Sequence, residues 1–110
     1  MVSPEDLQEV QLGCGGATLM TDGGREYIYL PALRLPAGCV PQNTEALLCL
    51  SEHSGYATRL FVSKPIPGRG ANWTTAMVLG KAWHTWSWNG VPSSLRPMEI
   101  LAEHLRGLHK

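Results

Sequence analysis

The chain is poor in aromatic residues and cysteine, and it has no excess charge of either sign. Its 110 residues include one Phe, 7% aromatic residues in all, and equal numbers of acids and bases. Zero net charge argues against a bulk electrostatic nucleic-acid binder, which usually shows a basic excess. The apolar stretches are far shorter than the ~20 residues that a membrane-spanning helix needs. The composition is typical of one globular domain, which we expect to cover residues 1–110.

The cysteines and histidines lack the spacing of a metal site. Structural zinc normally uses closely spaced ligand pairs, and neither the three Cys nor the four His form one, so we expect no metal and no cofactor. Met1 and Val2 lead into Ser3-Pro4-Glu5-Asp6 without a signal peptide, which favours a reducing, cytoplasmic setting. Cys49 lies in an apolar run and is expected to be buried. Cys14 and Cys39 are flanked by glycine or proline and are expected on exposed loops, either as reactive thiols or as inert ones.

The two halves of the chain differ in charge. Residues 1–52 hold seven acids and two bases, and residues 53–110 hold two acids and seven bases. No acid lies between Glu52 and Glu99, so a basic surface is expected there, as a partner-binding face or only as a solvated one. The alternative is that its bases pair with Glu5, Asp6 and Glu9 within the chain. The bases expected on this face are Arg59, Lys64, Arg69 and Lys81.

Turn residues divide the first half of the chain into short elements. Ser3-Pro4-Glu5-Asp6 predicts a helix start, and the glycines at 13–16 predict its end. Runs 17–20 and 26–30, joined by Asp22-Gly23-Gly24, predict a β-hairpin. The following segment is expected to be irregular because it contains Pro31, Pro36 and Pro41.

The second half combines two clear elements with one ambiguous stretch. The apolar run 46–50 and the run 59–62 predict neighbouring antiparallel strands. The Trp-rich stretch 73–88 fits neither a helical nor a strand period, so it is assigned to a loop or short strand. Pro97 begins a helix on which His104 is expected to be exposed and His109 to lie at the end. Its apolar stripe consists of Met98, Leu101, Ala102, Leu105 and Leu108.

The four tryptophans allow a structural and a functional interpretation. In a chain with one Phe, tryptophan is expected to fill the core. The alternative is a peptide- or nucleic-acid-binding module that uses the Trp cluster. His84 lies among these tryptophans, which could remove it from water, so it joins the candidate binding residues.

A series of short motifs carries a family resemblance over roughly residues 17–108. They are Leu35-Pro36-Ala37-Gly38, Ala46-Leu47-Leu48-Cys49-Leu50, Gly55-Tyr56, Leu60-Phe61-Val62-Ser63-Lys64-Pro65, Trp83-His84-Thr85-Trp86-Ser87 and Leu95-Arg96-Pro97. The chain resembles the bacterial ubiquitin-conjugating-enzyme-like (UBC-like) proteins of type E. That resemblance implies an α+β fold with a short N-terminal helix, a four-stranded antiparallel meander, a long irregular crossing segment and a C-terminal helix.

The chain departs from that family at the position of its chemistry. Conjugating enzymes carry their thioester cysteine in the crossing segment, beyond a His-Pro-Asn, and residues 50–110 contain neither feature. Without that thiol, the usual thioester cannot form. The expected function is therefore noncatalytic binding of a ubiquitin-like protein or its activating or ligation machinery. The alternative within the family is an active conjugating enzyme with a displaced nucleophile, either Cys39 or Cys14.

Overall fold

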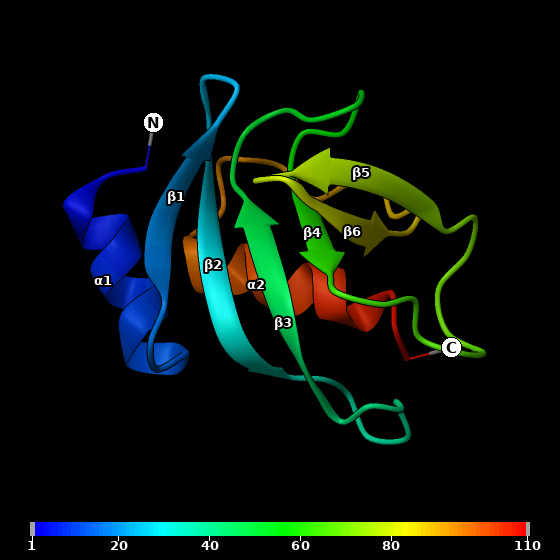
Figure 1. Cartoon of the computed structure of the whole chain (residues 1–110). Helices are drawn as coiled ribbons and strands as arrows, with labels where there is room; N and C mark the ends of the chain where they lie inside the picture. The colour runs from blue at the N-terminus through cyan, green and yellow to red at the C-terminus, as the bar shows by residue number, and fades with distance from the viewer. Residues whose placement is uncertain (1, 110) are drawn as a thin grey trace.

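The chain has an α+β fold in which two helices lie on one side of an antiparallel sheet. The computed structural model describes residues 2–109 and places six strands in the order β1-β2-β3-β4-β6-β5 (Figure 1). In chain order the elements are α1 (Pro4–Gly13), β1 (Thr18–Asp22), β2 (Arg25–Arg34), β3 (Asn43–Cys49), β4 (Arg59–Val62), β5 (Thr74–Val78), β6 (Lys81–Thr85) and α2 (Pro97–Arg106). Neither helix is long and apolar enough to cross a membrane within the described residues.

Local capping and turn chemistry produce the first three elements as predicted. The Ser3 side chain accepts a hydrogen bond from the Asp6 amide at 3.0 Å and so caps α1. Gly23 and Gly24 have φ values of 59° and 78°, which is the type I′ turn that closes a two-residue hairpin between β1 and β2. The prediction that Pro31 interrupts regular structure is wrong. β2 continues through it because a register shift between Leu30 and Leu33 accommodates the missing amide donor.

The central strands pair as the apolar runs predict. Leu47 lies opposite Phe61 and Leu48 opposite Leu60 in an antiparallel register between β3 and β4. All four residues of β4 are buried. The middle of the sheet is therefore covered on both faces.

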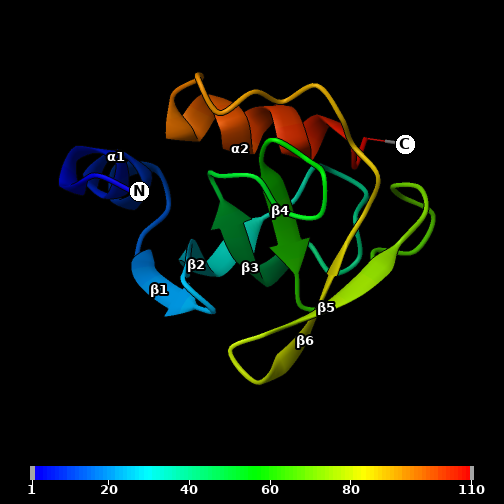
Figure 2. The same cartoon turned by 90° about the horizontal axis from the view of Figure 1, so that it is seen from above.

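The sheet has six strands, so the expectation of four is wrong. The Trp-rich stretch forms the β5–β6 hairpin, whose turn places Leu79 and Gly80 at φ values of 55° and 73°. β6 joins β4 only through the pairing of Val62 with His84, which allows the hairpin to curl across the face opposite the helices (Figure 2). Trp83 packs inward there, on the side chains of the central strands.

The curled sheet has two apolar cores. On the helix side, Ile100 and Leu101 of α2, and Leu108 just after it, join a cluster that includes Val10 of α1. On the other side, Leu47, Phe61 and Trp83 form a second cluster. Of the predicted stripe, Leu101 in α2 and Leu108 beyond its end are buried; Met98 and Leu105 are half-buried and Ala102 is exposed.

His104 corrects the predicted orientation of α2. Its side chain is buried, with 2% of its surface exposed, although the sequence predicted that it faces solvent. The hydroxyl of Thr58 donates to the Val91 carbonyl at 2.8 Å, so its oxygen accepts the Nε2 proton of His104, also at 2.8 Å. This pairing satisfies the imidazole inside the core, and burial lowers the pKa of His104 to about 4.

Candidate functional site

None of the three thiols has the exposed environment of a reactive cysteine. Cys49 is fully buried, as predicted. Cys39 is 4% exposed, so the expectation of an exposed loop thiol is wrong; its segment packs on the end of α2, where Sγ donates to the Leu108 carbonyl at 3.7 Å. Cys14 is half-buried after α1, and its burial raises the pKa of its thiol. The raised pKa lowers the thiolate fraction of Cys14, and burial keeps Cys39 and Cys49 away from a reaction partner.

Thiol labelling should follow this order of burial. In the folded protein we expect a maleimide to modify Cys14 slowly, because its thiolate fraction is small, and to leave Cys39 and Cys49 unmodified. Mass spectrometry of tryptic fragments identifies the adducts, and labelling in denaturant, where all three thiols react, is the control. Rapid native labelling of Cys39 or Cys49 would contradict the packing described here.

Two of the predicted basic residues are held inside the fold. Arg59 is 6% exposed, so the expectation that it reaches solvent is wrong. Its guanidinium lies 3.9 Å from the centre of the Tyr56 ring, and its Nε donates to Thr85 at 3.3 Å, an environment in which desolvation lowers the pKa of Arg59. Arg69 is half-buried and donates to the Leu108 carbonyl at 3.0 Å. Both guanidinium groups connect elements of the fold.

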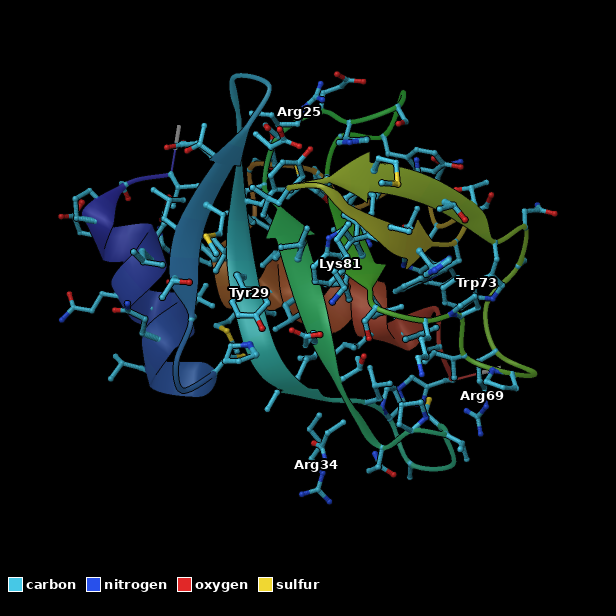
Figure 3. All side chains as sticks on the ribbon, viewed as in Figure 1. Arg25, Tyr29, Arg34, Arg69, Trp73 and Lys81 are labelled. Carbon is cyan, nitrogen blue, oxygen red and sulfur yellow. The ribbon has the colours of Figure 1, made fainter. Side chains whose placement is uncertain are left out.

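Of the remaining predicted binding residues, Lys81 is paired with a carboxylate on the sheet. Lys81 Nζ is 2.8 Å from Glu45, whose other oxygen accepts the Tyr29 hydroxyl, and these two bonds lower the pKa of Glu45. The hydrogen bond to Glu45 also raises the pKa of Tyr29. Figure 3 shows Lys81 near Tyr29 on the sheet, and Arg69 beside Trp73 at the edge of the molecule. Half-buried His84 is 3.2 Å from Thr75, and Lys64 is exposed.

The predicted pairing with Asp6 and Glu9 occurs, but through Arg96, which was not among the four bases expected on the basic face. Arg96 approaches Asp6 at 3.5 Å and Glu9 at 2.5 Å, while Glu9 also accepts the Met98 amide at 3.0 Å. That amide bond and Arg96 lower the pKa of Glu9, and Glu9 in turn raises the pKa of Arg96. These contacts attach α1 to the start of α2. Lys64 has no carboxylate of residues 2–109 within ion-pair distance.

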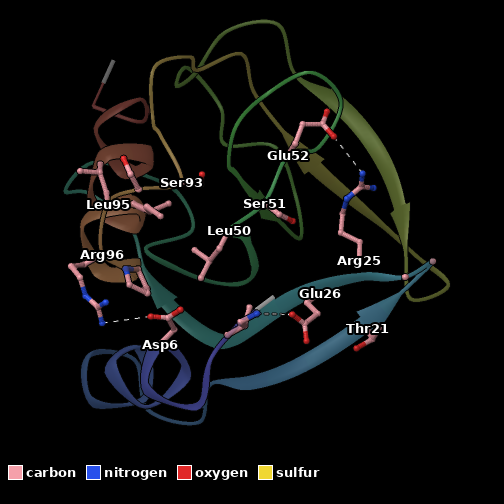
Figure 4. A pocket seen from close by; sticks show the side chains of 16 residues that line it. Asp6, Thr21, Arg25, Glu26, Leu50, Ser51, Glu52, Ser93, Leu95 and Arg96 are labelled. Atoms are coloured by element: carbon pink, nitrogen blue, oxygen red, sulfur yellow. Dashed lines mark hydrogen bonds and ion pairs between the residues drawn. The ribbon is translucent and has the colours of Figure 1, made fainter.

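An open cleft of about 1040 Å³ lies where four separate segments meet (Figure 4). Its walls are the start of α1, the β1–β2 turn, the residues after β3 and the segment 93–97 before α2. Leu50, Leu95 and Ile100 give it apolar surface. An ion pair between Arg25 and Glu52, at 3.7 Å, lies on one side, and the Arg96 cluster lies on the other.

The cleft has both apolar and paired charged surface but little means of covalent chemistry. None of the 16 described residues that line it is a cysteine or a histidine. Such a surface suits noncovalent contact with a polypeptide segment that is partly apolar and partly polar. Sequence reasoning missed the cleft because its residues come from four distant segments; the only local signal was Leu50 at the end of an apolar run.

The tryptophans contribute mainly to packing, as the structural interpretation predicted. Trp83 and Trp86 are 3% and 2% exposed. The indole nitrogens of Trp73, Trp83 and Trp88 donate to the backbone carbonyls of Arg69, Val78 and Glu103 at 2.7, 3.2 and 2.8 Å. The buried rings of Trp83 and Trp86 offer no face on which a base could stack, and Trp73 and Trp88 are half-buried.

Comparison with known proteins finds no match to this chain among family models, curated proteins or solved structures.

Proposed function

We propose that the chain is a noncatalytic, UBC-like binding domain of a bacterial ubiquitin-like modification system. The observation that carries this proposal is the placement of the thiols: two are buried, and the pKa of the half-buried one, Cys14, is raised. An enzyme that accepts an activated C-terminus on a thiol needs a thiolate that the donor can reach. A ubiquitin-like protein or its activating enzyme is therefore bound without covalent transfer.

The cleft supports a binding function because the segment just before the last helix lines it. The resemblance implies that the crossing segment before the last helix presents the reacting group, and here residues 93–97 of that segment line the cleft. They offer two serine hydroxyls, Leu95 and Arg96 in place of a thiol. The cleft can receive a partner segment by contact alone.

The alternative functions are less well supported by the packing. A displaced nucleophile would require Cys39 to leave the Leu108 carbonyl, or Cys14 to ionise against its burial. A Trp-based nucleic-acid or peptide module would require accessible indole rings, whereas Trp83 and Trp86 are buried.

A charging assay tests the proposal. A bacterial activating enzyme, loaded with its ubiquitin-like protein, is mixed with the chain and analysed on gels with and without reductant. We expect no reducible adduct, together with noncovalent retention of the partner on the immobilised chain. A reductant-sensitive adduct that disappears in Cys14→Ser or Cys39→Ser would make the chain an active conjugating enzyme, and complete lack of retention would also contradict the proposal.

A charge variant adds a control to the retention measurement. Lys64→Glu should slow association with an acidic partner and leave the melting temperature nearly unchanged, because Lys64 is exposed and pairs with no described carboxylate. Arg69→Glu should instead lower the melting temperature, because it removes the bond to Leu108. An association rate that Lys64→Glu does not change would remove Lys64 from the binding surface.

A further inference from the structure

The outer edge of β1 presents backbone groups without a partner. β1 pairs only with β2, and the hairpin closes at the pair Asp22 and Arg25. Antiparallel pairs alternate between hydrogen-bonded and non-hydrogen-bonded positions, so the amides and carbonyls of Leu19 and Thr21 point away from β2. The same alternation turns Ala17 outward, and there the Gln11 side chain of α1 already donates to the carbonyl at 3.0 Å.

The side chains of β1 do not protect this edge. Edge strands usually carry a lysine or proline that discourages pairing, and Thr18–Asp22 contains neither. Leu19 and Met20 are 37% and 36% exposed, and Leu12 in the last turn of α1 is 86% exposed. Exposed apolar side chains thus lie on both faces of β1, next to its unpaired backbone groups.

The position of α1 determines which occupant fits. α1 lies beside the outer edge of β1 on the helix side of the sheet (Figures 1 and 2). A second copy that paired its own β1 here would set two α1 helices against each other, and each carries three acids and no base. A single extended segment of another protein avoids this collision and this repulsion.

The charge around the edge indicates the composition of that segment. α1, β1 and the start of β2 carry five acids, and the bases near them are Arg25 and Arg96. Arg96 is already paired with Asp6 and Glu9. Basic side chains in the added segment would therefore meet a surface of opposite charge.

We infer that the free edge of β1 binds an extended, basic segment of a partner protein as an additional antiparallel or parallel strand. Main-chain hydrogen bonds to Leu19 and Thr21 hold the segment, and its alternating side chains contact Leu19 on one face of the sheet and Met20 on the other. Strand addition uses no thiol and requires no ubiquitin-like partner, so the inference can fail or hold independently of the charging assay.

The test uses a blocked heptapeptide of alternating lysine and valine, titrated into the full-length, isotope-labelled chain. We expect the largest amide shift changes at Leu19 and Thr21, and slower amide exchange at both in the complex. An otherwise identical peptide with glutamate in place of lysine should bind at least tenfold more weakly. No binding of the lysine peptide, shift changes centred on other strands, or equal binding of the glutamate peptide would overturn the inference.

A pair of proline variants provides the matched control. Thr21→Pro removes an outward amide that the fold does not use, and should weaken the lysine peptide at least tenfold. Thr75→Pro is the matched change on β5, the strand at the opposite edge of the sheet. Counting back from the turn that joins β5 to β6, the amide of Thr75 also points away from its partner strand. This variant should leave the affinity for the lysine peptide within twofold of the wild-type value. Equal affinity in wild type and folded Thr21→Pro would overturn the inference. If Thr21→Pro does not fold, the amide shift changes and exchange rates of the wild-type chain still test the inference.

Discussion

Replacing Phe61 by alanine is expected to lower the free energy of unfolding by about 3–5 kcal/mol, as for other buried aromatic truncations. Phe61 is fully buried in the middle of β4, in the core between the sheet and the β5–β6 hairpin. Its ring centre lies 5.0 Å from that of His53 and 6.2 Å from that of Tyr27, both edge-on. The substitution removes these contacts and leaves a cavity that the paired strands cannot close. Urea unfolding followed by tryptophan fluorescence measures the change.

Two further measurements distinguish loss of packing from a general defect. Phe61→Leu retains most of the volume and should cost much less, on the order of 1 kcal/mol. His53 has a lowered pKa, chiefly because of its burial, and NMR titration should show that pKa rise towards its ordinary value in Phe61→Ala. Equal costs for the leucine and alanine variants would show that the ring does not carry the packing of this core.

Acid should destabilise the protein through His104, by about 3 kcal/mol. Burial, with a smaller effect from nearby Arg59, lowers its pKa from 6.5 to about 4 in the folded state. Between these values the unfolded chain binds a proton that the folded chain does not. The contribution of neutral His104 is therefore complete above about pH 6.5 and is lost as the pH falls towards 4. Urea unfolding at a series of pH values between 4 and 7 measures this slope.

The glutamine variant isolates His104 from the carboxylates that titrate in the same range. His104→Gln retains a donor for the Thr58 hydroxyl but cannot take up a proton, so its stability should depend much less on pH between 6.5 and 4.5. His109→Gln is the control because His109 is exposed, and it should keep the wild-type slope. A slope in His104→Gln equal to that of the wild type would assign the pH dependence to other groups.

Local sequence signals predicted the elements that depend on few neighbours. The serine cap, the two-glycine turn and the continuous apolar run of β3 each act within a few residues, and each is present in the structure. The pairing of β3 with β4 also followed, because both runs are short, apolar and separated by a polar bend. The β5–β6 hairpin was missed because its two strands are very short and their apolar alternation is broken by exposed Met77 and by buried Thr85.

The sequence by itself determined the α+β class, the first hairpin, the central strand pair and the amphipathic last helix, because capping, turn conformation and periodicity are properties of neighbouring residues. Only the tertiary structure decided that Arg59, Cys39 and His104 are buried, and that Arg96 pairs with the acids of α1 while Lys81 pairs with Glu45. Burial and ion pairing depend on which distant segments meet. The curl of the sheet and the packing of α1 against α2 bring those segments together, and local sequence patterns do not predict these contacts.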